Sequence, residues 1–133
     1  MLYHTKTPHD YVGDFQKAFA HAIATAINND TNEILIKVHE QRNFDGILSD
    51  AIGRIARLLQ NIGGIVKLNE VRVYSETERT ESLFRSGIIV AAHVKEKCLS
   101  YILEDKRATD IIYVPLTQEE YEYYVSTYDS IEI

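Results

Sequence analysis

Two histidines, His39 and His93, each follow a short and mostly apolar run of residues. Runs of this kind are typical of buried parallel strands, so we expect each histidine at the carboxyl end of a strand. An imidazole in such a place can act as a general acid or base near neutral pH. We therefore predict that His39 and His93 are catalytic, and that Glu40 or Glu76 orients one of the rings.

Positive and polar side chains follow the same runs. Arg42 and Asn43 come soon after the first histidine, Lys95 comes just after the second, and Ser75 follows a third run. Arginine, lysine and the free N–H groups of a helix N-terminus attract carboxylates and phosphates. We predict that Arg42, Asn43, Ser75 and Lys95 bind a small anionic metabolite or nucleotide beside the two histidines.

Simpler interpretations of these residues stay open. A histidine at a strand end is often only a polar residue where the sheet meets solvent. The two histidines and a carboxylate such as Asp45 or Glu96 are an alternative metal site, but the spacing of a known metal motif is absent, so no metal is predicted. Cys98 lies on an apolar stripe at helical spacing and is predicted to be a core residue.

The motifs of several common enzyme classes are missing. The stretch HEQRNFDG over residues 39–46 holds no glycine-rich dinucleotide loop, and the chain has no phosphate-loop lysine signature, serine nucleophile elbow or CxxC pair. We therefore expect no cofactor. A magnesium-dependent nucleic-acid enzyme is a weaker alternative, because no acidic pair is expected where the strands end. Whether the protein is an enzyme stays open.

Length and charge restrict the class of protein further. The 133 residues suit one domain, residues 1–133, with one core. A net charge of -6 argues against binding to the nucleic-acid backbone. The chain has one cysteine and no apolar stretch of the roughly 20 residues that cross a membrane. We expect a cytoplasmic protein that binds neither nucleic acid nor membranes.

The elements that would position these residues alternate along the chain. Apolar spacing predicts helices over 10–28, 43–62 and 95–107 and from Thr117 onward, and a capping-box pattern predicts a short helix from 75–78 to Gly87. Apolar runs predict strands over 33–39, 70–74, 88–94 and 110–116, with 65–69 as a connector. Gly46 and Gly53, inside the second helix, are expected to allow close packing on the sheet.

This alternation predicts a small doubly wound, Rossmann-like or flavodoxin-like α/β domain of about four parallel strands with helices on both faces. Numbered along the chain, the strands should lie in the order 2-1-3-4. Arg72 places a charge in strand 2, which suits an edge, whereas strand 3 is uniformly apolar and suits the centre. His39 and His93 would then meet where the strand order reverses, which is where ligands usually bind.

The C-terminal segment 117–133 predicts self-association. Tyr123, Ile131 and Ile133 have no expected partner within one chain, and tyrosine is enriched at interfaces. We therefore predict a homo-oligomer, most simply a dimer, and a noncatalytic interaction module is the alternative function. In the competing interpretation, the tail covers the edge strand 110–116 of its own chain.

Overall fold

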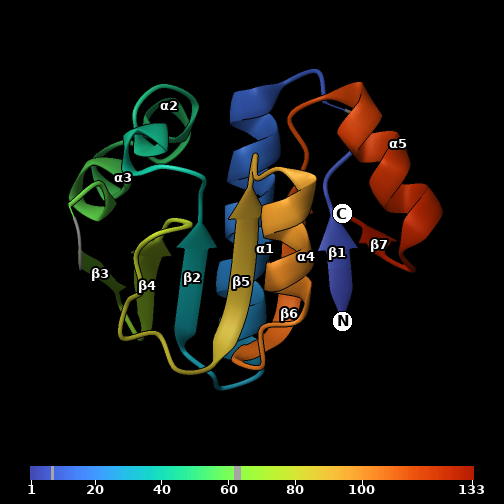
Figure 1. Ribbon diagram of the computed structural model, residues 1–133. Helices are drawn as coiled ribbons and strands as arrows, with labels where there is room; N and C mark the ends of the chain where they lie inside the picture. Colours follow the sequence, from blue (N-terminus) through green and yellow to red (C-terminus); the bar gives the residue numbers. More distant parts are fainter. Residues whose placement is uncertain (7, 62–63) are drawn as a thin grey trace.

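A sheet of seven strands forms the centre of the computed structural model, which describes residues 1–6, 8–61 and 64–133 (Figure 1). The strand order is β3-β4-β2-β5-β6-β1-β7. Every neighbouring pair is parallel except β3 and β4, which form an antiparallel hairpin. The strands are β1 (Leu2–His4), β2 (Glu33–Lys37), β3 (Ile65–Leu68), β4 (Val71–Glu76), β5 (Gly87–Ala92), β6 (Ala108–Val114) and β7 (Ile131–Glu132).

Two hydrophobic clusters lie on the two faces of this sheet. One contains side chains of α1 (Tyr11–Asn28), α2 (Ile47–Ile52) and α3 (Arg54–Leu59), and the 3-10 turn η1 (Gln41–Phe44) adds Phe44 to it. The other contains side chains of α4 (Glu96–Leu103) and α5 (Gln118–Thr127). Figure 1 shows α1 and α4 on opposite sides of β5. The chain is therefore a mixed α/β fold with a mostly parallel sheet.

The four predicted strands are β2, β4, β5 and β6, and their spatial order β4-β2-β5-β6 is the predicted order 2-1-3-4. The expectation of about four parallel strands was wrong, because β1, β3 and β7 extend the sheet. β3 covers the outer side of β4, and β1 covers the outer side of β6. β4 and β6, which were predicted to be the edge strands, therefore both lie inside the sheet.

The predicted helix 43–62 is interrupted. Gly46 and Gly53 have φ angles of 75° and 58°, which place both residues outside the right-handed helical region. They divide the segment into η1, α2 and α3. A Cβ atom at either glycine would meet nothing within 4 Å, so the expectation that these glycines allow close packing was wrong. Residues 62 and 63, the predicted helix end, lie outside the described residues.

The predicted helix after residue 75 does not form. Ser75 and Glu76 belong to β4, and residues 77–86 form a segment without helix, here called the crossing segment, that leads to β5. Thr77 N and Oγ1 both lie 3.0 Å from Thr80 Oγ1. Phe84 is buried against Tyr74 at a ring-centroid distance of 6.0 Å. These contacts hold the crossing segment against the sheet without a helix.

The last two predicted helices are present with different lengths. α4 ends at Leu103, four residues before the predicted end at Arg107. α5 begins with the predicted capping box, in which Thr117 Oγ1 accepts from Glu120 N and the Glu120 side chain accepts from Thr117 N.

The C-terminal tail folds back on its own chain. β7 pairs with β1, and Ile133 packs against the first hydrophobic cluster. The expectation that Ile133 lacks an internal partner was therefore wrong, whereas Ile131 is half exposed. In the described part of the chain, no helix combines the length and hydrophobicity that a membrane crossing needs.

Candidate functional site

A cavity of about 300 Å³ lies just beyond the carboxyl ends of β2, β5 and β6, and is called here the strand-end cavity. Five of the six predicted site residues line it. They are His39, Arg42, Asn43, His93 and Lys95. Asp45 adds a carboxylate, and the side of the cavity next to α2 is apolar.

The chain path explains why these residues meet. β2 leads into α2 and α3 on one face of the sheet, whereas the neighbouring strand β5 leads into α4 on the other face. The two connections leave in opposite directions, so a crevice remains between them at the carboxyl edge. This is the switch point where α/β sheets usually hold ligands.

His93 is held in an unusual conformation. Its φ angle is 57°, in the left-handed region that few non-glycine residues adopt, and its backbone N–H donates to Val114 O over 3.0 Å. The Nε2 atom of the ring is buried and has no hydrogen-bond partner among the described residues. Burial lowers the pKa of His93, and the charge of Glu120 opposes this only in part. The ring is therefore neutral at pH 7, with a nitrogen free to bond.

His39 contacts two carboxylates. Its Nδ1 atom lies 3.1 Å from Glu78 Oε1, and its Nε2 atom lies 3.8 Å from Glu40 Oε1. The Nδ1 contact lacks the alignment of a hydrogen bond in this structure. Of the two predicted orienting carboxylates, Glu40 is near the ring, but Glu76 is not among its contacts. Glu78, which follows β4, is the closer partner that the sequence did not indicate.

A local turn positions Arg42 and Asn43. Asn43 Oδ1 accepts a hydrogen bond from Glu40 N over 2.6 Å, which closes η1 as a capping box. Asn43 is therefore inside a short turn and does not begin a long helix as predicted. Arg42 Nε pairs with Glu40 Oε2, and the Arg42 side chain is largely exposed. Part of its positive charge is thus neutralised by a neighbour.

Lys95 supplies a positive charge at the opposite wall. It is the N-cap residue of α4, and its side chain makes no capping hydrogen bond to the N–H groups of that helix start. Within residues 1–6, 8–61 and 64–133, Lys95 makes no ion pair. An exposed lysine beside the N–H groups of a helix start favours an anion.

Ser75 lies away from this cavity. It is buried in β4, and its Oγ atom donates to Leu59 O at the end of α3 over 2.8 Å. The alternation of side chains along β4 directs Ser75 to the face that carries α3. The expectation that Ser75 faces the crevice was therefore wrong.

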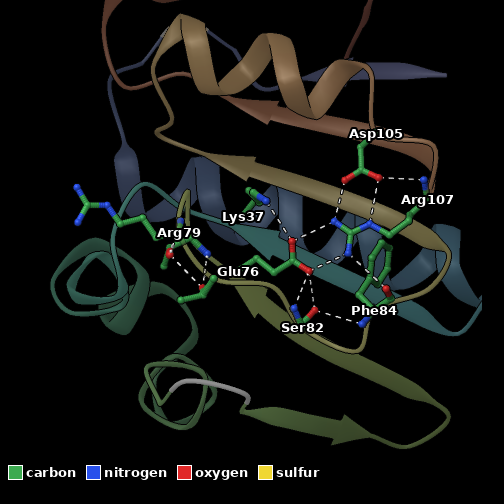
Figure 2. A network of polar contacts seen from close by, with 9 residues as sticks. Lys37, Glu76, Arg79, Ser82, Phe84, Asp105 and Arg107 are labelled. Atoms are coloured by element: carbon green, nitrogen blue, oxygen red, sulfur yellow. Dashed lines mark hydrogen bonds and ion pairs between the residues drawn. The ribbon is translucent and has the colours of Figure 1, made fainter.

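A buried ionic network on the α4 side of the sheet was missed by the sequence patterns (Figure 2). Glu76 is fully buried and accepts from Lys37 Nζ over 3.1 Å, from Arg107 Nη1 and Nη2 over 2.8 and 3.0 Å, and from Ser82 N and Oγ. Burial raises the pKa of Glu76, but hydrogen bonds from Arg107, Ser82 and Lys37 outweigh it and lower the pKa to about 2. This network fixes the crossing segment to the sheet.

The sequence shows the charged residues of this network, but Arg107 and Glu76 were each assigned to the end of a predicted helix. Arg107 followed an apolar helical stripe and matched a helix C-terminus, and Glu76 matched a capping box. A buried glutamate at a strand end requires cations, and Lys37 ends the neighbouring strand. Reading the register of β2 against β4 would have paired Lys37 with Glu76.

Metal ligands do not gather anywhere in the described part of the chain: it holds no group of three or more His, Cys, Asp and Glu side chains that could bind a metal ion. Comparison with known proteins found no match to any family model, curated protein or solved structure.

Proposed function

We propose that this protein binds a small anionic metabolite in the strand-end cavity. The main observation behind the proposal is the position of His93 at the switch point of the sheet. There it combines a left-handed backbone with a buried Nε2 atom that has no partner among the described residues. Strained backbone conformations and unsatisfied buried polar atoms both concentrate at functional sites.

The charges around the cavity support an anion. Lys95 and Arg42 are cationic, and the start of α4 adds partial positive charge. A volume of about 300 Å³ is at the lower limit for ligand cavities. A carboxylate or a phosphate monoester therefore fits better than a whole nucleotide.

Acid–base chemistry on the bound ligand is part of the proposal. His39 Nδ1 lies 3.1 Å from the carboxylate of Glu78, an arrangement that can hold an imidazole in one orientation. His93 is neutral and able to accept a proton. In this proposal His39 and His93 serve as the acid and base groups, and no cofactor is needed.

Calorimetric titration tests binding at this cavity. The probes are inorganic phosphate, glycerol phosphate and succinate. We expect at least one to bind, and His93→Asn and Lys95→Gln each to weaken it about tenfold or more, because each removes one charge-assisted or buried contact. Asparagine tolerates the left-handed backbone, so His93→Asn keeps the fold. Lys67→Gln, on the exposed face of β3, is the matched control and should change nothing. Failure of all three probes at about 10 mM, or unchanged binding in both variants, contradicts the proposal.

The alternative function is a noncatalytic homo-oligomeric module. Tyr123, Val125 and Ile131 are exposed near the C-terminus, and the outer edge of β7 has no partner strand in the described residues. Light scattering tests this alternative: a dimer mass that falls to a monomer mass in Tyr123→Ser with Ile131→Ser supports it, and a monomer mass for the unchanged protein excludes it. A cytoplasmic location stays a prediction from the cysteine content.

A further inference from the structure

A second and larger cavity, of about 470 Å³, lies on the α4 side of the sheet and is called here the α4-side cavity. One wall is α4, and the other is the crossing segment 77–86. It shares no lining residue with the strand-end cavity. Where a helix was predicted after β4, the crossing segment without helix lines this cavity.

The floor of this cavity is fixed before any ligand arrives. Arg107 uses all five of its N–H groups: Nε and Nη2 donate to Asp105, Nη1 and Nη2 donate to Glu76, and Nη1 also donates to Phe84 O (Figure 2). Arg107 therefore has no donor left for a ligand. Lys37 lines the cavity and donates one N–H to Glu76, and its ammonium group has two further N–H donors.

The two walls carry opposite charges that are not paired in the described part of the chain. Lys97 comes from α4 and Glu81 comes from the crossing segment; both line the cavity, and neither makes an ion pair there. Glu78, a second carboxylate of the crossing segment, also lines the cavity but lies 3.1 Å from His39 Nδ1. The charged groups of the floor, in contrast, compensate one another, since Lys37 and Arg107 balance Glu76 and Asp105. A ligand with a single charge could pair with Lys97 or with Glu81, but not with both.

Apolar surface lies beside these charges. Tyr101 lines the cavity from α4 with 67% of its surface exposed, and the buried side chain of Ile102 lies beside it. An exposed tyrosine at the rim of a cavity offers a flat apolar face with a polar end. It suits the side chain of a small ligand.

We propose that the α4-side cavity binds a small zwitterion of the amino-acid class. The carboxylate of the ligand pairs with Lys97 and the free donors of Lys37, its ammonium group pairs with Glu81, and its apolar side chain packs on Tyr101. This site is distinct from the anion site proposed above, because the two cavities share no lining residue.

Three probes that share a phenyl ring and differ in charge test this proposal by calorimetry: phenylalanine, phenethylamine and 3-phenylpropionate. We expect phenylalanine to bind at least about tenfold more tightly than either analogue, since each analogue lacks one charged group. Glu81→Gln should remove the advantage over 3-phenylpropionate. Lys97→Gln should reduce the advantage over phenethylamine, because Lys37 still pairs with the ligand carboxylate. Glu104→Gln and Lys106→Gln alter exposed charges just beyond α4 and should leave the affinities unchanged.

Equal affinity of the three probes, or no binding of phenylalanine at about 10 mM, overturns the proposal. Loss of phenylalanine binding in His93→Asn also overturns it, because it would place the probe in the strand-end cavity. The same variant separates the two proposals: it should weaken anion binding about tenfold or more and leave phenylalanine binding unchanged.

Discussion

The Nδ1 atom of His39 lies 3.1 Å from the Oε1 atom of Glu78, and each of these residues lines a different cavity. The Glu78 N–H also points to His39 O over 3.5 Å, so the start of the crossing segment lies against the end of β2. The pair thus forms part of the boundary between the two cavities. A substitution of either residue should therefore change ligand binding in both the strand-end cavity and the α4-side cavity.

A double-mutant cycle with His39→Gln and Glu78→Gln should give a small coupling free energy, between about 0.2 and 1 kcal/mol, by urea unfolding. Both side chains are about 40% exposed, at 41% and 38%, and exposed pairs contribute little to stability. The role of Glu78 is then to position the imidazole ring of His39. A coupling above about 2 kcal/mol would instead make this pair a structural ion pair.

The thiol of Cys98 should react slowly with iodoacetamide. Burial, followed by the charge of Glu78, raises the pKa of Cys98 to about 11. At pH 8 the thiolate fraction is then about a hundredth of that of an ordinary cysteine, and labelling should be slower by about the same factor. Glu78→Gln should speed up labelling, because it removes a charge that opposes the thiolate. Labelling at the rate of a free thiol would show that Cys98 is not in the environment described.

Glu76 should make the protein sensitive to acid. Its pKa falls from 4.5 to about 2 on folding, so its contribution to stability is complete above pH 4.5 and is lost as the pH falls from there toward 2. Glu76→Gln should lower the free energy of unfolding at pH 7 by about 3 kcal/mol or more, because Asp105 alone then balances Lys37 and Arg107, and one positive charge stays uncompensated. The difference from the unchanged protein should shrink as the pH falls.

Chemical denaturation at several pH values measures this difference. Glu104→Gln, at an exposed position, is the control and should follow the unchanged protein at every pH. Parallel stability curves for Glu76→Gln and the unchanged protein from pH 7 to pH 2 would mean that the buried network does not hold this carboxylate in its charged form.

The left-handed backbone of His93 can be tested by two substitutions that remove the same ring. His93→Gly should be more stable than His93→Ala by about 1 kcal/mol, because glycine adopts a φ angle of 57° without the steric cost that alanine meets. Thermal unfolding of the two variants gives the comparison. Equal stability, or a more stable alanine variant, would mean that residue 93 leaves the left-handed region in solution.

The sequence was informative where structure depends on local pattern and chain path. β2 and β5 belong to short, mostly apolar runs, and their parallel order follows from the alternation with helices. That order brings His39 and His93 to one edge of the sheet. β1 and β7 have only three and two residues, too few for a pattern to be visible. β1 pairs with β6 along the sheet, and β7 pairs with β1, so both depend on partners distant in the sequence.

The sequence failed where distant residues decide the outcome. Residues 75–78 match a capping box and therefore predicted a helix start. Instead, Arg107, which is 31 positions from Glu76, donates a hydrogen bond to the Glu76 carboxylate, and Glu76 belongs to β4. Ser75 was misplaced because its face depends on the alternation within β4, which pairs it with Ile36 of β2. Long-range partners of this kind are invisible to a single sequence read locally.

Imidazole resonances in ¹H–¹⁵N NMR spectra, followed while glycerol phosphate is added at pH 7, test most directly whether the strand-end cavity binds an anion through His93. We expect the ring nitrogens of His93 to shift in a saturable manner, with the dissociation constant found by calorimetry. The rings of His4 and His21, which do not line the cavity, should stay unchanged. An unmoved His93 at saturating ligand, or equal shifts at His4 and His21, would contradict the proposed site.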